Sequence, residues 1–322
     1  MVCPATTVQN NGNWRTAERW AALLSRYAQV SIHLEVDEVT IQSADIMIAL
    51  HARRSASAIQ SWRHIHPSQP LIVVLTGTDL YRDIANHPEA QKSLDLADRL
   101  VVLQELGIQA LPLQHQAKTH CIFQSTRSWK PAMKSSHKLR VLMVGHLRDE
   151  KSPQTFFEAS RTLATHQDIQ FDLIGSGLEP RLLEEAQELD RSLVNFHYLG
   201  ALPHSTTRRH IRHAHLLIHP SLMEGGAHVI MEAICSGTSV LASNISGNRG
   251  MLGSQYDGYF DWGQSDQLCG LLLQCRNSQT QKTKIDRFLD HLSAQCAERA
   301  NLFTPDNEQH SLLELLNECL PA

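Results

Sequence analysis

The sequence predicts an α/β protein with two halves, each built around a parallel sheet covered by helices. Three observations indicate this class. Short apolar runs alternate with helical patterns, which is the order that parallel sheets require. The alternation stops at a polar, basic segment, 125–138, which is typical of a linker, and then resumes. The 322 residues, 42% of them apolar, are enough to form two cores.

The first half is expected to extend over residues 1–134. A short strand begins at Met1, and further strands are predicted at 29–34, 45–50, 71–75 and 99–103. Helical patterns occupy the intervals, at 14–27, 53–64 and 88–97. Apolar runs of this length are much shorter than the about 20 residues that span a bilayer, so we expect no membrane segment.

The second half is expected to extend over residues 135–304. Its strands are predicted at 139–144, 170–174, 194–198, 215–219 and 239–242. Its helices are predicted at 153–164, 179–189, 205–213 and 228–236, the last of them stopped by a left-handed residue at Gly237. Residues 285–322 indicate helices with a break at Thr304-Pro305, and the final helix, 305–322, is expected to pack back on the first half.

Composition and charge exclude several classes of function. The net charge is -4 and no basic stripe runs along the chain, so we expect no nucleic acid partner. The N-terminus lacks a basic region followed by an apolar one, so no secretory signal is expected. Seven cysteines without a CxxC pair indicate reduced thiols rather than a disulfide framework. Together these features predict a cytoplasmic protein whose partners are small molecules.

Histidines are frequent, and four of them follow one another closely: His210, His213, His215 and His219. A zinc site needs three or four convergent ligands with supporting residues, and no Cys or carboxylate completes a set here. We therefore interpret this series as a solvated helix face.

Chemistry is expected in the loops that follow the strands, because ligands of such sheets bind beyond the carboxyl ends of the strands. The strongest of these loops is SLMEGGAHVIME, residues 221–232. Glu224 lies in the loop and Glu232 about one turn into the following helix, so their carboxylates suit two different sets of hydroxyls. The loop also offers flexible glycines and free N–H groups at the helix start, from Gly225, Gly226 and Ala227. The alternative is a plain turn with two solvated glutamates.

A basic loop, residues 145–153, follows the first strand of the second half. Arg148 and Lys151 can neutralise a diphosphate leaving group, whose charge grows in the transition state. His146 is a further candidate in the same loop. The alternative is a charged loop that caps the helix starting at Pro153.

Three loops of the first half carry candidate anion-binding groups. Residues 10–17 supply Gly12 and Asn13, although a turn before an N-capped helix has the same pattern. His51 follows strand 45–50, and it could equally be a lone histidine beside two solvated arginines, Arg53 and Arg54. The loop after strand 71–75 offers Thr76 and Thr78 as small donors and Asp79 as an acid. It also offers Arg82, whose planar group is a charge-assisted donor. Asp79 could also be a simple helix N-cap.

Two motifs are absent. No Asp-x-Asp triplet occurs, which favours charge neutralisation by Lys and Arg without a metal ion. No GxxxxGK[ST] phosphate loop occurs either, so ATP hydrolysis has no support. We therefore expect no metal and no cofactor.

The spacing of Glu224 and Glu232, with seven residues between them, resembles the two-glutamate motif of the family 4 retaining glycosyltransferases. That resemblance implies the glycosyltransferase B fold, with two Rossmann-like domains facing each other across a cleft. It also implies that Glu224 contacts the donor sugar and Glu232 the ribose of the nucleotide. Lys151, six after Gly145, matches a family position. His146 stands where the family has a basic residue, so either it or Arg148 is implied there.

The resemblance further implies that His51 is an active-site histidine. The sequence departs from the family at Gly226 and His228, where bulkier apolar residues are usual. This leaves more room, or a polar contact, near the sugar.

Several segments together resemble the selenosugar synthase branch of this family: NNGNW, ALHARRSA, VVLTGTDLYRDI, VGHLRDEKSP, GALPHS, HPSLMEGGA and GNRGMLG. That resemblance implies transfer of the sugar of a UDP-sugar, UDP-N-acetylglucosamine or UDP-glucose, to selenophosphate. UDP and eventually phosphate are released, and a functional link to other selenoneine-pathway enzymes follows. The implied acceptor residues are Asn13, Arg53, Arg54, Thr76, Thr78, Asp79 and Arg82. Because selenium is a strong nucleophile, His51 and Asp79 would orient the acceptor rather than deprotonate it.

Three alternatives stay open. An ordinary family 4 transferase would share the donor half but act on a hydroxyl or a thiol. A non-catalytic module would bind the sugar nucleotide without turnover. An epimerase acting on a UDP-sugar would share the fold.

Overall fold

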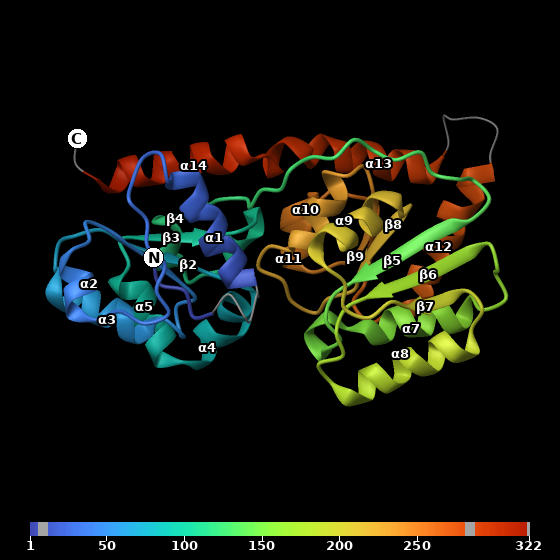
Figure 1. The fold of residues 1–322 in the computed structure, drawn as a ribbon, viewed down its shortest axis with the longest axis horizontal. Helices are drawn as coiled ribbons and strands as arrows, with labels where there is room; N and C mark the ends of the chain where they lie inside the picture. Colours follow the sequence, from blue (N-terminus) through green and yellow to red (C-terminus); the bar gives the residue numbers. More distant parts are fainter. Residues whose placement is uncertain (6–11, 281–286, 321–322) are drawn as a thin grey trace. The chain divides into compact units, whose positions relative to one another are not determined.

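The computed structural model describes residues 1–5, 12–280 and 287–320, and it shows two compact units, each with one parallel sheet (Figure 1). The first unit comprises Met1–Ser125, Glu224–His228 and Leu302–Ala322. The second comprises Thr126–Met223 and Val229–Asn301. The predicted α/β class with two parallel-sheet domains is therefore confirmed.

The sheet of the first unit has the order β1-β2-β3-β4, with every neighbouring pair parallel. Its strands are β1 (Met47–Leu50), β2 (Leu71–Val74), β3 (Arg99–Val102) and β4 (Thr119–Cys121). Leu50 pairs with Val74, so β1 and β2 end at the same edge and the loops after them start side by side. Those loops carry His51 and Thr76.

Two apolar cores cover the two faces of this sheet. Along β2, Leu71 and Val73 belong to one core, and Ile72 and Val74 to the other, because side chains alternate between faces. The first core adds residues of α2 (Glu38–Gln42), α3 (Ala56–Ile65), α4 (Ile84–Asn86) and α5 (Pro88–Leu96). The second adds residues of α1 (Gly12–Leu24) and α14 (Pro305–Cys319).

Several expectations for this unit were wrong or incomplete. The short strand expected at Met1 and the strand expected at 29–34 do not form; among the described residues, Val2 makes only isolated parallel bridges, to His33 and Ala49. Strand β4 was not predicted. Asp79 is not an N-cap but the first residue of a π-helical turn, η1 (Asp79–Asp83), in which the N–H of Ile84 donates to the carbonyl of Asp79. Four short helices were also missed: α2, α4, η2 (Glu105–Ala110) and α6 (Leu113–Gln116).

The sheet of the second unit has the order β10-β9-β8-β5-β6-β7, again parallel throughout. Its strands are β5 (Leu139–Val144), β6 (Ile169–Ile174), β7 (Phe196–Tyr198), β8 (Leu216–His219), β9 (Ser239–Ser243) and β10 (Tyr259–Phe260). All five predicted strands are confirmed, and the two-residue β10 is additional. Strands β5 and β8 are neighbours, so the loops after them lie at one place on the sheet edge.

Helices cover both faces of this sheet as well. On one side, α7 (Pro153–Thr162), α8 (Pro180–Ser192) and α12 (Ser265–Thr280) pack together, and on the other lies α9 (His204–His213) (Figure 1). The remaining helices are α10 (His228–Ile234), α11 (Ser246–Leu252), α13 (Phe288–Arg299) and η5 (Ala300–Phe303). Gly237 has φ +69°, as the predicted left-handed stop requires. The break before Pro305 is confirmed, with the Thr304 side chain accepting from the N–H of Asn307.

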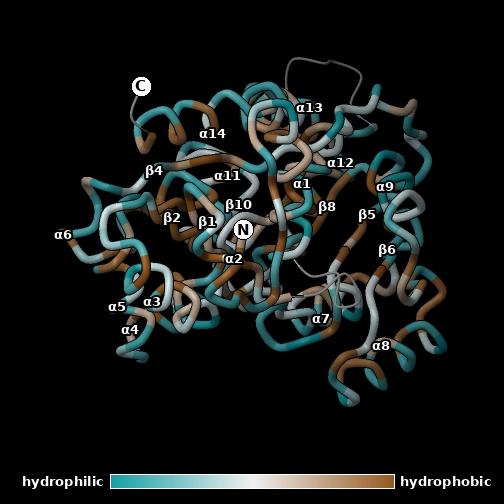
Figure 2. The backbone as a smooth tube through the Cα atoms, turned by 60° about the vertical axis from the view of Figure 1, so that its left-hand side comes forward, coloured by the Kyte–Doolittle hydropathy of each residue, from teal (hydrophilic) through white to brown (hydrophobic). Residues whose placement is uncertain are grey.

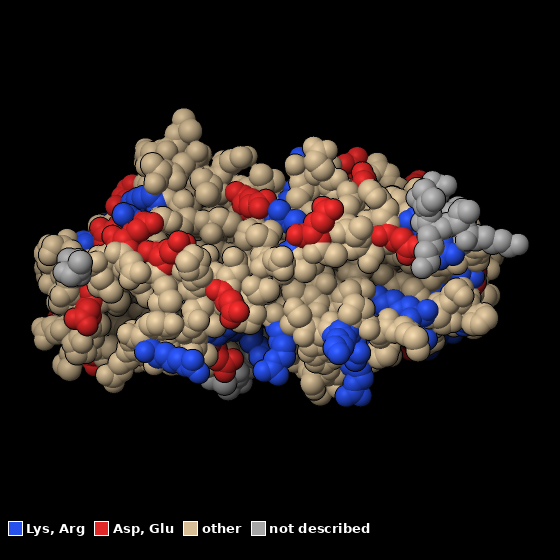
Figure 3. Space-filling view, turned by 90° about the horizontal axis from the view of Figure 1, so that it is seen from above, with Lys and Arg blue, Asp and Glu red and all other residues tan. Residues whose placement is uncertain are grey.

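Hydrophobic residues gather along the strands of both sheets, whereas much of the surrounding helices is hydrophilic (Figure 2). No helix among the described residues combines the length and the apolar character needed to cross a bilayer. On the face drawn in Figure 3, basic and acidic side chains both occur, in separate small groups. All seven cysteines are described and none forms a disulfide, and burial raises the pKa of Cys275 to about 12 and that of Cys296 to about 11.

The histidine series 210–219 is not one solvated face. His213 is exposed on α9, but His215 and His219 are buried in and beside β8. His215 accepts a hydrogen bond at Nδ1 from the N–H of Arg140 and lies with Nε2 2.9 Å from the carbonyl oxygen of Ser135. The expectation of a solvated face is therefore wrong for these two residues, because His219 lies in β8 and His215 is buried just before it.

Candidate functional site

Glu232 lies in α10, and its side chain is nearly buried, with the whole residue 8% exposed. Its carboxylate oxygen Oε1 is 2.6 Å from Nε2 of His204, the first residue of α9. One turn further along α9, Nη1 of Arg208 is 3.7 Å from the same oxygen. The solvated glutamate of the alternative interpretation is thus not what the structure shows at this position.

Arg208 is itself held by several groups of the second unit. Its guanidinium donates to Oγ1 of Thr126 at 2.6 Å, to the carbonyl of Arg127 at 2.9 Å and to Oγ of Ser236 at 3.2 Å. It also lies 5.1 Å from the centre of the Trp129 ring, a cation–π distance. Arg208 therefore fastens the segment after Ser125 to α9 and gives Glu232 a fixed positive neighbour.

The loop before Glu224 rests on a buried polar network at the carboxyl ends of β8 and β9. Oγ of Ser243 donates to the carbonyl of Ser221 at 2.6 Å, and Nδ2 of Asn248 donates to the carbonyl of Ser243 at 2.9 Å. Oγ of Ser221 is 3.3 Å from Nε2 of His219. Because these groups satisfy one another away from water, the start of the loop is held firmly.

Glu224 is also buried, at 8% exposed, as are Gly225 and Ala227, whereas Gly226 is half-buried. Residues 224–228 group with the first unit, while Glu232 belongs to the second. The predicted helix start is confirmed at His228, so the N–H groups of this loop lie at the N-terminal end of α10.

The basic loop after β5 is shaped by close backbone contacts. Gly175 lies so near this loop that a side chain on it would meet the carbonyl oxygen of Gly145 at 1.9 Å. The N–H of Leu147 donates to the carbonyl of Ser176, and the N–H of Asp149 donates to Oε1 of Glu179. The loop then closes in a short helix, η3 (Asp149–Lys151).

The side chain of Lys151 passes over Gly145, with its Cγ and Cδ 3.7 Å from the place of a Cβ there. Arg148 is exposed, and its Nε is 3.9 Å from Oε2 of Glu150. The carbonyl of Glu150 accepts a 2.9 Å hydrogen bond from the N–H of Leu222, two residues before Glu224. The basic loop and the loop after β8 are therefore tied together at one edge of the sheet.

His146 is partly exposed in this loop and is held by Ser176. Its Nδ1 accepts from the N–H of Ser176 at 3.2 Å and is 2.6 Å from the Ser176 hydroxyl oxygen. Desolvation, and then the charges of Arg148 and Lys151, lower the pKa of His146 below its usual value. An acceptor Nδ1 leaves the proton on Nε2, so His146 can donate one hydrogen bond to an anion but adds no positive charge at neutral pH.

In the first unit, the predicted His51 is buried at the end of β1, with 1% of its surface exposed and with φ 72°. A left-handed conformation is costly for a residue with a side chain, so surrounding contacts must hold it. Its Nδ1 is 3.1 Å from Oδ1 of Asp79, and the other oxygen of Asp79 accepts from the N–H of Ala52 at 2.7 Å. Asp79 therefore fixes both the ring and the turn after it.

Asp83, at the other end of the π-helical turn, completes this cluster. Its Oδ2 is 3.7 Å from Nε2 of His51 and 2.9 Å from Nε of Arg53, and its Oδ1 accepts from Nε of Arg82 at 3.2 Å. His51, Asp79 and Asp83 bring three possible metal-ligand atoms within 4.8 Å of one another. However, the guanidinium groups of Arg53 and Arg82 already pair with Asp83, so we interpret the cluster as an ion-pair network beside His51.

The other first-half candidates lie nearby or outside the described residues. Arg54 is exposed in the turn after β1, and Thr76 and Thr78 are half-buried just before η1. Gly12 and Asn13 form the first turn of α1, while their neighbours Asn10 and Asn11 lie outside the described residues. The structure thus gathers His51, Arg53, Asp79 and Arg82 around Asp83.

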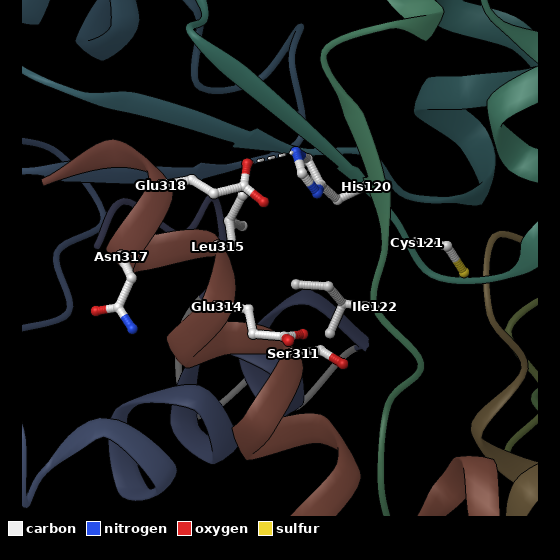
Figure 4. A pocket seen from close by; sticks show the side chains of 8 residues that line it. All are labelled: His120, Cys121, Ile122, Ser311, Glu314, Leu315, Asn317 and Glu318. Atoms are coloured by element: carbon white, nitrogen blue, oxygen red, sulfur yellow. Dashed lines mark ion pairs between the residues drawn. The ribbon is translucent and has the colours of Figure 1, made fainter.

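A cavity of about 530 Å³ opens elsewhere in the first unit, between β4 and α14 (Figure 4). Glu318 in this cavity lies 3.4 Å from both His120 and Arg99. None of the residues predicted from the sequence lines it, so it is separate from the candidate site. Its lining residues are His120, Cys121, Ile122, Ser311, Glu314, Leu315, Asn317 and Glu318.

Four residues of the candidate site were missed by sequence reasoning: Asp83, His204, Arg208 and Trp262. Asp83 stands four residues after Asp79, and His204 stands four before Arg208, which on a helix places each pair on one face. That spacing is the signal that could have found them. Trp262, whose indole N–H donates to Oγ of Ser152 at 2.8 Å, offers no such signal because it comes from a distant loop.

Solved structures share this fold. The chain resembles Anabaena HepE in complex with UDP-glucose, with a TM-score of 0.68 and 16% identity over 93% of this chain and 89% of that one. Against Staphylococcus aureus TarM in complex with UDP, the TM-score is 0.65 at 15% identity, over 84% of this chain and 55% of that chain. Against the pneumococcal O-GlcNAc transferase GtfA in complex with UDP and GlcNAc, the TM-score is 0.61 at 17% identity, over 88% of this chain and 60% of that chain. The fold is therefore that of the glycosyltransferase B class.

Residues 126–302, more than half of the chain, match the family described as Glycosyl transferases group 1, and the chain belongs to this family. It is also similar to the 2-deoxystreptamine N-acetyl-D-glucosaminyltransferase of Niallia circulans, at 28% identity over 111 residues. That similarity covers 34% of this chain and 28% of the relative.

Proposed function

We propose that this chain is a metal-independent glycosyltransferase that transfers the sugar of UDP-N-acetylglucosamine or UDP-glucose to selenophosphate. One observation carries the donor part of the proposal. The anchored carboxylate of Glu232 and the basic loop around Lys151 occur together in the second unit, with the basic loop bonded to the loop after β8 through Glu150 and Leu222. Membership of the group 1 family supports sugar transfer. The UDP or UDP-glucose bound in several similar structures supports the choice of nucleotide.

In this proposal, Glu232 accepts from the ribose hydroxyls and Glu224 from the sugar hydroxyls. Arg148 and Lys151 balance the charge that grows on the leaving diphosphate, and His146 donates one hydrogen bond from Nε2. Gly225, Gly226 and Ala227 let the backbone approach the donor at the start of α10. The absence of an Asp-x-Asp triplet supports balancing by side chains instead of a metal ion.

The acceptor is assigned to the first unit. Arg53 and Arg82 lie on either side of Asp83 and suit a small anion such as selenophosphate, with Arg54, Asn13, Thr76 and Thr78 as further donors. His51 and Asp79 keep an orienting role. Selenium forms a bond to the anomeric carbon while the bond from that carbon to the UDP oxygen breaks. Water then cleaves the phosphorus–selenium bond and phosphate leaves.

A second candidate is an ordinary transferase that acts on a hydroxyl or thiol. It is favoured by the similarity to the Niallia relative, a 2-deoxystreptamine N-acetyl-D-glucosaminyltransferase. Donor residues are the same in both candidates, so only the acceptor discriminates between them.

The test combines each UDP-sugar with selenophosphate, thiophosphate, or a panel of alcohols and thiols, and measures UDP release together with product mass. We expect UDP release and a selenosugar mass with selenophosphate. Release with alcohols or thiols alone would establish the second candidate. UDP binding without release for any acceptor would indicate a non-catalytic module.

Variants locate the two sites. Removing hydrogen bonds to charged groups costs about 1.5–3 kcal/mol, so Glu224→Gln and Glu232→Gln should lower kcat/KM for the UDP-sugar by roughly ten- to a hundredfold. Glu184→Gln, on the exposed surface of α8, is the matched control. Arg53→Ala and Arg82→Ala should raise the KM for selenophosphate and leave that for the UDP-sugar unchanged. An unaltered selenophosphate dependence would place the acceptor elsewhere.

A further inference from the structure

His204 is the one residue, in the part of the chain that the structure describes, that donates a hydrogen bond to the carboxylate of Glu232. Its Nε2 is 2.6 Å from Oε1, whereas Nη1 of Arg208, at 3.7 Å, gives only electrostatic attraction. Nη1 of Arg208 is instead 2.6 Å from Thr126. The direction of the Glu232 carboxylate therefore depends on His204.

The contact leaves the second carboxylate oxygen available. His204 and Arg208 both lie nearest to Oε1, by a hydrogen bond and by charge attraction respectively. Oε2 accepts no hydrogen bond from any described residue. The side chain of Glu232 is 11% exposed, and that of His204 is 56% exposed, so part of this contact is reached by solvent. A carboxylate anchored through one oxygen presents the other in a single direction, which suits a ligand hydroxyl.

We propose that His204 is a positioning residue for nucleotide binding: it holds Glu232 so that Oε2 meets the ribose diol of a nucleoside diphosphate. This inference rests on the proposed function, since it assumes that Glu232 binds the ribose. A glutamate with several rotatable bonds would otherwise have to be ordered when the nucleotide arrives, and ordering of this kind weakens binding. Because His204, at the start of α9, already holds Glu232 before the nucleotide binds, this side chain does not have to be ordered on binding.

A thermodynamic cycle tests the proposal. UDP and 2′,3′-dideoxy-UDP are titrated calorimetrically into the wild-type protein and into His204→Ala. We expect His204→Ala to weaken UDP binding about five- to tenfold, the effect of losing one hydrogen bond that orients a charged group. Binding of dideoxy-UDP should hardly change, because that ligand lacks the hydroxyls that Glu232 would accept from.

Two further variants make the result specific. His204→Gln places an amide N–H near the position of Nε2 and should restore most of the UDP affinity. His213→Ala removes an exposed histidine from the same helix, which does not contact Glu232, and should leave both affinities unchanged. Circular dichroism checks that each variant is folded.

The titrations distinguish a failure of the role given to His204 from a failure of the proposed function. Equal losses for UDP and dideoxy-UDP in His204→Ala, or no loss for either, would overturn the role of His204 while leaving UDP binding intact. If the wild-type protein binds neither nucleotide, the proposed function fails, and the inference fails with it.

Discussion

At Ser152 the backbone adopts φ 46° and ψ 50°, a left-handed conformation that a residue with a side chain adopts only when its surroundings hold it. Ser152 lies between Lys151 and the helix that starts at Pro153, and a residue before proline is disfavoured from the right-handed helical region. The indole N–H of Trp262 donates to the Ser152 hydroxyl at 2.8 Å. The half-exposed Trp262, 47% exposed, thus supports the end of the basic loop.

Trp262→Phe should weaken UDP binding, because it keeps an aromatic ring but removes the hydrogen bond that holds Ser152 beside Lys151. A hydrogen bond of this kind contributes about 1 kcal/mol, so the Kd for UDP should rise roughly fivefold. Binding of uridine, which has no phosphates, is the comparison and should change little.

The double variant with Ser152→Ala gives the control. Both substitutions remove the same hydrogen bond, so their effects on the Kd for UDP should be clearly less than additive. Additive effects would show that Trp262 acts in some other way.

Single residues divide into those that a local pattern reveals and those that it cannot. Glu224 and Glu232 are spaced along one loop and the helix after it, and Lys151 stands six residues after Gly145 in another loop. Such local spacings made all three candidates visible in the sequence. His204 meets Glu232 across 28 positions and Trp262 meets Ser152 across 110, contacts that only the packing of helices and loops creates. The burial of His215 and His219, by contrast, agrees with the strand expected at 215–219.

Among the elements, α14 depends on one buried charge. Glu308 is fully buried and accepts from Nε of Arg19 at 2.8 Å, from the Trp20 indole at 2.7 Å and from the N–H of Ser125 at 2.8 Å. It thereby joins α14 to α1 and to the end of the chain segment that follows β4. Three donors around one carboxylate satisfy most of its capacity, as a buried charge requires.

Glu308→Ala should destabilise the first unit strongly, because it leaves Arg19, Trp20 and Ser125 without their acceptor. Breaking a buried ion pair from one side costs about 3–5 kcal/mol. Urea unfolding followed by tryptophan fluorescence measures the change in the free energy of unfolding.

Glu314→Gln on the same helix is the matched control. Glu314 is 64% exposed and pairs with His310 at 3.2 Å, an exposed contact expected to contribute less than about 1 kcal/mol. Equal effects of the two substitutions would contradict the central role assigned to Glu308.

Elements of ordinary length were predictable from apolar periodicity and stop signals, as with α7, α8 and the break before Pro305. The failures have physical reasons. Strands β4 and β10 contain three and two residues, too few for a period to show. The π-helical turn at Asp79 depends on Asp79 bonding to the turn after β1, a tertiary contact that no local propensity records.

At the scale of the whole molecule, the stability of the second unit should depend on pH through His215. Burial, and then the charge of Lys134, lower the pKa of His215 from 6.5 to about 4. A depressed pKa means that the folded chain binds fewer protons than the unfolded chain between these values. The stability is therefore complete above pH 6.5 and is lost as the pH falls toward 4.

The lowering of the pKa from 6.5 to about 4 corresponds to a loss of about 3 kcal/mol in the free energy of unfolding once the pH has fallen through this range. His215→Asn should abolish that part of the pH dependence, so the free energy of unfolding should fall less between pH 6.5 and 4 than in the wild-type protein. Chemical denaturation across this range is the measurement. His310→Gln, at an exposed position, should keep the pH dependence of the wild-type protein. If His215→Asn keeps the same pH dependence as well, His215 is not its cause.

The global architecture was the most predictable level, because two series of alternating strands and helices on either side of a polar segment allow few arrangements. What the sequence could not show was which residues join each unit. Residues 224–228 group with the first unit although they interrupt the second in the chain. Such membership is decided by packing, not by position.

The same noncontiguous first unit has a consequence for how the protein is made. Glu308 follows Ser125, one of its partners, by 183 positions. At roughly 5–20 residues per second, a ribosome needs about 10–40 s to travel from one to the other. During that interval the nascent first unit lacks α14, and Leu312, Leu315 and Leu316 have not yet covered its second core. The half synthesised first is thus completed last, because its second core is covered only once α14 has been made.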